Sequence, residues 1–317
     1  MSLPARKPLR VAFGESVAEM AEKDPRIVML DGDVGVSTRA DIFEASCPQR
    51  FFQMGIAEQN MLAVAAGFAT VGFIPFVSTF ACFAVARALD SIRVLIAQPK
   101  LNVKIAGGYA GLLAGKTGKT HLMFDDVSIM RAMANMAVIA PADEMETRQA
   151  IQTAVEIDGP VYLRITRETS PLLFDSTYRF EFGRGVVVRD GKDVSLVTTG
   201  VQTGRVVEAA EILSQQGVNA LVLHLPTIKP FDSDAIIEAA RATGFVITIE
   251  EGTVVGGLGG AVAETLADRF PVTVKRLGIP DVFGESGADE ALLEKYRLSA
   301  SKVAEDVLML LGAARRR

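Results

Sequence analysis

The sequence of 317 residues has no tryptophan, only two cysteines and only two histidines. Cys47 and Cys82 are too few and too isolated for a disulfide framework. Neither belongs to a Cys-x-x-Cys metal or redox pattern. We therefore expect a protein of the reducing cytoplasm.

The chain also lacks an excess of positive charge. The formal net charge is -5, which gives no general attraction to nucleic acid or to an anionic membrane. The one basic run, 315–317, is most simply a solvated chain end. The opening residues 1–8 include basic side chains with no apolar core behind them, so no secretory signal is expected.

An uncharged stretch runs from Gln59 to Ala86 and is long enough to raise the question of a membrane span. Gly67, Gly72 and Pro75 divide it into a helix, a turn and a short strand. We therefore expect this stretch to be buried within protein.

Hydrophobic residues make up 49% of the chain, which is ample for two packed domains. In the first half, predicted strands and helices alternate, which indicates an α/β domain with a parallel sheet covered by helices on both faces. Ligands then belong at the carboxyl ends of the strands. The expected strands are 26–30, 51–54, 74–77, 102–106, 137–140 and 161–165, and the expected helices are 10–23, 58–70, 82–98, 126–135 and 142–156.

A second alternating series predicts a smaller α/β domain. Between the two series the periodicity lapses, so we divide the chain into a first domain at 1–175, a linker at 176–191 and a second domain at 192–317. The expected strands of the second domain are 194–198, 220–225, 245–249 and 272–277, and its helices are 203–215, 232–242, 259–270 and two more near 289 and 301.

One carboxylate, Glu58, stands at the mouth of the uncharged stretch, where the protein interior is expected to begin. It could simply complement the dipole at the start of a helix. The segment 55–61, Gly-Ile-Ala-Glu-Gln-Asn-Met, suggests a more specific role, as do 74–80, Ile-Pro-Phe-Val-Ser-Thr-Phe, and 118–121, Gly-Lys-Thr-His.

In order and spacing, these three segments resemble the pyrimidine-binding half of transketolases and their thiamine-diphosphate relatives. The likeness covers most of the chain, but in a full-length transketolase the matching region begins about halfway along the sequence. It implies the C-terminal subunit of a split transketolase, an enzyme that moves a two-carbon ketol unit from a ketose phosphate to an aldose phosphate.

The resemblance implies roles for particular residues. Glu58 would hydrogen-bond the aminopyrimidine of thiamine diphosphate and favour its imino tautomer. Phe80 and Phe83 would form an aromatic wall beside that ring, although a core role is the simpler explanation of such a pair. His121 would polarise the donor carbonyl or shuttle protons. His224, in an apolar strand, is expected to be a core or strand-end residue.

Three more positions match family sites. Ser37 and Arg167 would hold the sugar phosphate, because a guanidinium and a hydroxyl both donate to phosphate oxygens. Asp33 would face the cofactor across a subunit interface, or it is an ordinary turn aspartate. The glycine-rich run 256–260 fails the Gly-x-Gly-x-x-Gly test, since Val262 replaces the last glycine, and we expect a closely packed helix start.

Four positions depart from the family pattern. Tyr109, Thr117 and Leu122 stand where transketolases usually have His, Asp and Gln, and Ala86 replaces a third aromatic. Because Tyr109, Thr117 and Leu122 fall on the substrate side of the site, we expect an unusual donor or acceptor sugar.

The family's diphosphate and magnesium motif is missing from this sequence. A partner, the N-terminal subunit, would hold that end of the cofactor and the Mg²⁺, most plausibly in an α2β2 assembly. Alternatives are the beta subunit of a 2-oxoacid dehydrogenase, a 1-deoxyxylulose-5-phosphate synthase, and a non-catalytic scaffold subunit.

Overall fold

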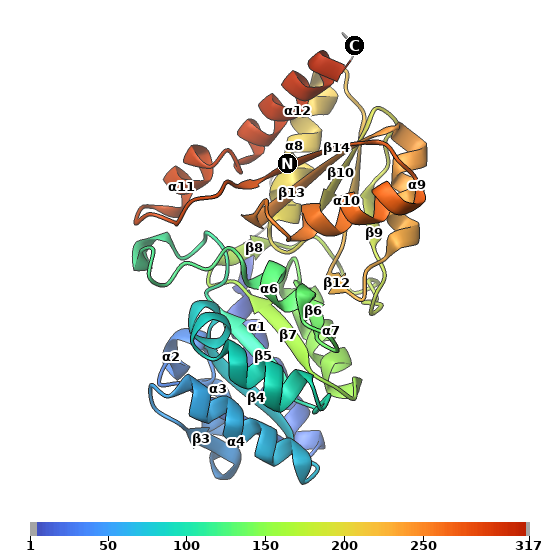
Figure 1. Ribbon diagram of the computed structural model, residues 1–317. Helices are drawn as coiled ribbons and strands as arrows, with labels where there is room; N and C mark the ends of the chain where they lie inside the picture. The colour runs from blue at the N-terminus through green and yellow to red at the C-terminus, as the bar shows by residue number, and fades with distance from the viewer. Residues whose placement is uncertain (1–4, 315–317) are drawn as a thin grey trace.

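The structure is a computed structural model that describes residues 5–314. The basic run at 315–317 and the first four residues of the chain lie outside the described part. Figure 1 shows two layered α/β units, the first coloured blue to green and the second yellow to red. Two such units are what the two alternating series predict.

A seven-stranded sheet forms the centre of the first unit, in the order β12-β6-β7-β5-β4-β2-β3. Six of these strands are parallel, as the alternation predicts. They are β2 (Ile27–Asp31), β3 (Phe51–Gln53), β4 (Ile74–Phe80), β5 (Lys104–Gly108), β6 (Ala137–Ile139) and β7 (Val161–Ile165). The inner strands β2, β4, β5 and β7 are buried along their whole length, which explains why most of their residues are apolar.

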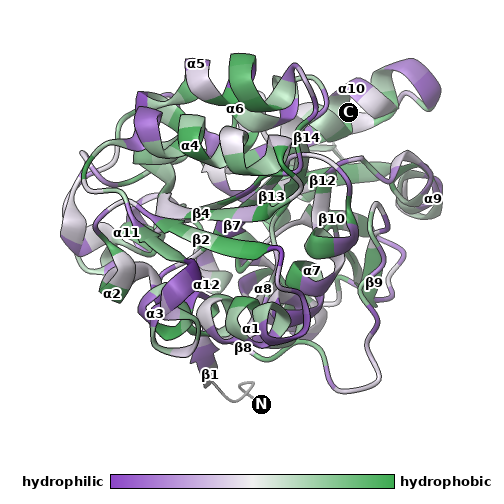
Figure 2. Cartoon of the chain, turned by 90° about the horizontal axis from the view of Figure 1, so that it is seen from below, coloured by the Kyte–Doolittle hydropathy of each residue, from purple (hydrophilic) through white to green (hydrophobic). Residues whose placement is uncertain are grey.

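Helices cover both faces of this sheet. Figure 2 shows α1 (Leu9–Lys23), α3 (Asp41–Ser46) and α7 (Glu144–Glu156) on one side of the hydrophobic strands. On the other side lie α4 (Glu58–Thr70), α5 (Leu89–Ser91) and α6 (Asp126–Ala132). The short helix α2 (Gly35–Thr38) follows β2 directly.

The uncharged stretch folds as expected into a helix, a turn and a strand, namely α4 and β4. Among the described residues, no helix is long and apolar enough to cross a membrane. The expected helix at 82–98 is helical but irregular, because two π-helical segments, Phe83–Arg87 and Ile92–Ala97, flank the short α5. At the wide first turn the carbonyl of Arg87 accepts a hydrogen bond from Gln59 Nε2 at 3.0 Å, a partner from another helix.

The second unit has a five-stranded sheet in the order β14-β13-β10-β11-β9. Its strands are β9 (Val186–Arg189), β10 (Val194–Thr198), β11 (Ala220–His224), β13 (Phe245–Thr253) and β14 (Thr273–Ile279). Its helices are α8 (Gln202–Gln215), α9 (Ser233–Thr243), α10 (Leu258–Arg269), α11 (Asp289–Lys295) and α12 (Ala300–Ala314).

Both sheets have an antiparallel edge that the alternation did not predict. Strand β9 lies inside the expected linker 176–191, where its β-branched valines pair with β11, so that segment is not simply a connection. Strand β12 (Thr227–Lys229) returns from the second unit to pair with β6 of the first. A small ribbon of β1 (Ala5–Pro8) and β8 (Thr169–Pro171) completes the strands.

Two predictions about the second unit are confirmed. The glycine-rich run starts α10, where a Cβ on Gly257 would lie 2.1 Å from Glu250 Oε2. Glu250 accepts hydrogen bonds at 2.8 Å from the backbone of Leu258 and Gly259, so it satisfies the first turn of that helix. His224 ends β11 fully buried, with Glu146 Oε2 2.9 Å from its Nε2.

Candidate active site

Glu58 is the first residue of α4, and only 5% of it is exposed. Among the described residues its one side-chain partner is Arg87, whose Nη1 donates to Oε1 at 2.9 Å. The guanidinium carbon of Arg87 also lies 3.9 Å from the ring centroid of Phe83. A flat, hydrogen-bonding group therefore rests on Phe83 while it binds Glu58.

Four predicted side chains meet next to this pair. Phe80 and Phe83 stack with centroids 5.5 Å apart, and Tyr109 stacks on Phe80 at 4.1 Å. The imidazole of His121 presents an edge to both phenylalanines, at 5.9 and 5.2 Å. Phe80 ends β4 and Tyr109 directly follows β5, so the cluster sits at the carboxyl edge of the parallel sheet, as expected.

Two arginines converge on the hydroxyl of Tyr109. Arg167 Nε donates to it at 3.2 Å, and Arg10 Nη1 lies 3.4 Å from it. Arg10 also donates to the backbone carbonyl of Ser37 at 2.8 Å, which joins Ser37 to the cluster. Burial opposes the charge of Arg167, but the hydrogen bond to Tyr109 and the neighbouring carboxylate of Glu168 leave its pKa raised.

The sequence analysis missed Arg10. At the start of an amphipathic helix, an arginine reads as a surface residue. Only the fold brings Arg10 of α1 next to Tyr109, which follows β5, and next to Ser37 of α2. In the structure, one feature marks Arg10 as a candidate binding residue. Its Nε is buried and has no hydrogen-bond partner among the described residues.

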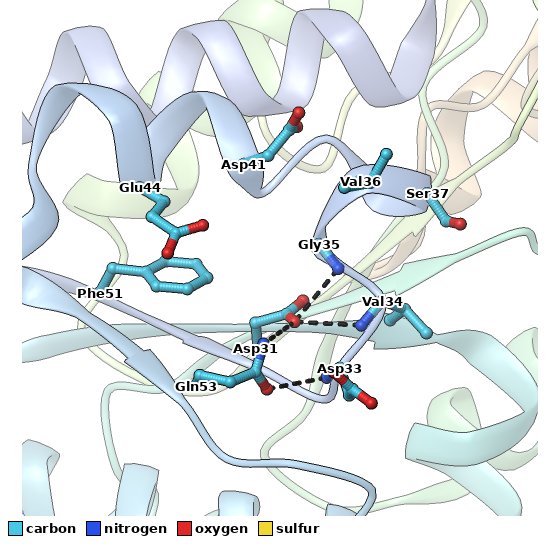
Figure 3. A pocket seen from close by; sticks show the side chains of 10 residues that line it. All are labelled: Asp31, Asp33, Val34, Gly35, Val36, Ser37, Asp41, Glu44, Phe51 and Gln53. Carbon is cyan, nitrogen blue, oxygen red and sulfur yellow. Dashed lines mark hydrogen bonds between the residues drawn. The ribbon is translucent and has the colours of Figure 1, made fainter.

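A hollow of about 250 Å³ opens around the segment that follows β2 (Figure 3). Asp33 and Ser37 are the two predicted site residues that line it. The buried Asp31 contributes an oxygen, Oδ1, that has no partner, while Oδ2 accepts from Val34, Gly35 and Gln53. Burial raises the pKa of Asp31, and these hydrogen bonds oppose part of the rise. The hollow is lined by Asp31, Asp33, Val34, Gly35, Val36, Ser37, Asp41, Glu44, Phe51 and Gln53.

The other departures from the family pattern are not part of these contacts. Thr117 donates its hydroxyl to the carbonyl of Ala114 at 2.6 Å, so it stabilises its own turn. Leu122 is buried, and Ala86 is exposed within the first π-helical turn.

The residues present fit one half of thiamine diphosphate. Phe83 already carries the planar guanidinium of Arg87, so a planar aminopyrimidine could stack there within reach of Glu58. The other half of the cofactor is the diphosphate, which the family binds together with Mg²⁺. The described residues hold no group of three or more His, Cys, Asp or Glu that could bind a metal ion.

Comparison with known proteins gives the same picture over the whole chain. Residues 6–171 match the transketolase pyrimidine-binding domain, and residues 183–303 match the transketolase C-terminal domain. The chain is 41% identical over 305 residues to a putative transketolase C-terminal section of Methanocaldococcus jannaschii, covering 95% of this chain and 96% of that protein.

Two further matches are similarly complete. A 6-deoxy-6-sulfo-D-fructose transketolase subunit of Clostridium sp. is 39% identical over 295 residues, or 93% of this chain and 92% of that protein. A solved structure is described as "Split gene transketolase, inactive beta4 tetramer". It is 47% identical with a TM-score of 0.89, and the match covers 96% of this chain and 98% of that one. The resemblance seen in the sequence is thus confirmed: the chain belongs to the transketolase family of transferases, among the C-terminal subunits of split enzymes.

Proposed function

We propose that this chain is the pyrimidine-binding subunit of a thiamine-diphosphate-dependent transketolase, and that a separate N-terminal subunit completes its active site. The observation that carries the proposal is the position of Glu58. It is a buried carboxylate at the start of α4, next to a stacked aromatic pair and a histidine edge.

Each of these residues has a defined task in ketol transfer. When bound, thiamine diphosphate supplies the carbanion chemistry that breaks and forms the carbon–carbon bond. Glu58 holds a proton at the pyrimidine ring nitrogen, and Phe80 and Phe83 orient that ring by stacking. His121 presents its ring edge to both phenylalanines, next to where the donor sugar would lie, so it can move a proton to or from the donor oxygen.

The arginine cluster is suited to the anionic end of a sugar. Arg10 and Arg167 reach the same hydroxyl from different elements, and their remaining donors can pair with phosphate oxygens. Ser37 and Asp33 line the hollow of Figure 3, and we assign Ser37 to the sugar phosphate and Asp33 to the cofactor across the subunit interface.

A non-standard sugar is part of the proposal. Tyr109 and Thr117 replace a family histidine and aspartate, and the Thr117 hydroxyl is engaged by its own turn. The relative named as a 6-deoxy-6-sulfo-D-fructose transketolase subunit supports this part of the proposal. A normal rate with xylulose 5-phosphate as donor would contradict this part.

We further propose that the N-terminal subunit holds Mg²⁺ and the diphosphate, in an α2β2 assembly located in the cytoplasm. The similar solved structure, described as a split gene transketolase, inactive beta4 tetramer, supports the need for a second kind of subunit.

The test is calorimetric titration of thiamine diphosphate and Mg²⁺ into the chain alone and into its mixture with the N-terminal subunit. We expect tight binding only in the mixture, and loss of turnover in Glu58→Ala. Glu144→Ala is the matched control, since Glu144 also starts a helix but lies away from the cluster. Full turnover of Glu58→Ala would favour a scaffold role instead.

A further inference from the structure

The loop at 109–124, called the substrate loop below, carries Tyr109, Thr117 and His121 and contains little regular structure. In Figure 1 it is the green loop that projects below α11, so it lies against the second unit. Its backbone is held from that side by carboxylates. The second unit therefore contacts the substrate loop, although the side chains clustered around Tyr109 and His121 belong to the first unit.

Glu251 makes the most buried of these contacts. It lies on β13 and is only 2% exposed. Its Oε1 accepts from the backbone N–H groups of Leu112 at 2.6 Å and Leu113 at 3.2 Å, and its Oε2 pairs with Arg205 at 3.1 Å. The loop approaches so closely that a Cβ on Gly111 would lie 2.3 Å from Oε1, and the φ of Gly111 is +84°.

Asp289 makes the second contact, from the first turn of α11. Its Oδ1 accepts from the backbone N–H of Gly115 at 2.9 Å, while Gly287 donates to the carbonyl of Gly115 at 3.1 Å. Gly115 begins the short 3₁₀ turn Gly115–Thr117, and His121 follows four residues after its end. The far end of the loop is fixed as well, because Thr253 donates to the carbonyl of Phe124 at 2.9 Å.

We propose that Glu251 and Asp289 are positioning residues, which set the path of the substrate loop and thereby place Tyr109 and His121 for the sugar. The inference rests on the proposed function, because it assigns the second unit a part in sugar recognition. Neither carboxylate touches the four clustered side chains. They act through backbone amides, whose place along the loop fixes where the flanking side chains point.

Glu250 provides an internal control. It is the neighbour of Glu251 on β13 and is nearly as buried, at 3% exposed. It too accepts from two consecutive backbone N–H groups, but those belong to α10 within the second unit. Glu250→Gln therefore matches Glu251→Gln in chemistry and burial, and it leaves the substrate loop untouched.

The first measurement is hydrogen exchange in the purified full chain. In Glu251→Gln we expect exchange of the Leu112 and Leu113 amides to rise about fivefold or more, since a neutral acceptor holds them less strongly. In Glu250→Gln these amides should exchange at the wild-type rate, even if the melting temperature falls. Equal loop exchange in the two variants would overturn the proposal.

The second measurement uses the complex with the N-terminal subunit. For Glu251→Gln we expect the donor KM to rise about fivefold or more and the dissociation constant of thiamine diphosphate to change less than about twofold. Parallel losses in sugar and cofactor binding would point to a general structural defect and overturn the proposal. If the wild-type complex binds no cofactor, the proposed function fails, and loop exchange alone still decides the positioning role.

Asp289→Asn keeps the test decisive if Glu251→Gln does not fold. Asp289 lies near the surface, so its replacement is better tolerated, and the exposed Glu290 beside it gives the control Glu290→Gln. We expect faster exchange of the Gly115 amide and a raised donor KM in Asp289→Asn only. Wild-type values for both would overturn the role of Asp289.

Discussion

The arginine cluster gives the sharpest prediction about substrate binding. Arg167→Met keeps most of the side-chain volume and removes the charged fork that we assign to the sugar phosphate. Arg167 is 30% exposed, and its ion pair with Glu168 at 2.9 Å lies on the surface, where such pairs contribute little. The loss on mutation should therefore come mainly from the substrate.

The expected size follows from the kind of contact. A hydrogen bond from a charged group contributes about 1.5–3 kcal/mol, which corresponds to roughly ten- to a hundredfold in kcat/KM. Partial exposure of Arg167 places the effect near the lower end. Arg10, whose Nη1 already approaches the same hydroxyl at 3.4 Å, can take over part of the contact. We therefore expect a loss of about tenfold.

The assay compares kcat/KM of the reconstituted enzyme for a phosphorylated ketose and for its unphosphorylated form, in wild type and in Arg167→Met. The tenfold loss should appear with the phosphorylated sugar only. Arg26→Met, which removes another exposed ion-paired arginine far from the site, serves as the control and should leave both values unchanged. An equal loss with both sugars would show that Arg167 acts on the structure of the site and does not bind phosphate.

Three further predictions concern other parts of the same unit. Burial lowers the pKa of Lys104 to about 7, below its unfolded value, so the unfolded chain binds more protons between about pH 7 and 10. The free energy of unfolding should therefore rise with pH across that window by up to about 1.4 kcal/mol per unit, and urea titrations of Lys104→Met should lack this rise. Arg87→Ala should lower the free energy of unfolding by about 1 kcal/mol, because Glu58 loses its one side-chain partner; an unchanged urea midpoint would contradict that. Tyr109→Phe keeps its ring stack but removes the hydroxyl that orients two guanidinium groups, so steady-state kinetics should show the donor KM raised by a few-fold, about 1 kcal/mol or less, while calorimetry shows unchanged cofactor affinity.

The sequence by itself determined the layered architecture and the centre of the candidate site. Continuous apolar strands alternating with helices predict a parallel sheet, because both faces of such a sheet are buried and its strands must be apolar throughout. The motif around Glu58 and the segments ending at Phe80 and His121 identified the family, since their order and spacing are local properties of the chain. These predictions needed no knowledge of which strands become neighbours.

Tertiary structure alone decided the contacts between residues far apart in sequence. Arg10 reaches Tyr109 across 99 residues, and Glu251 reaches Leu112 across 139. Neither pair leaves a periodic signal, because each depends on how whole elements pack. The π-helical turn at 83–87 and the antiparallel edges β9 and β12 escaped prediction for a related reason. Their residues are compatible with ordinary helix or connection, and it is packing against partners elsewhere in the fold that selects the final backbone.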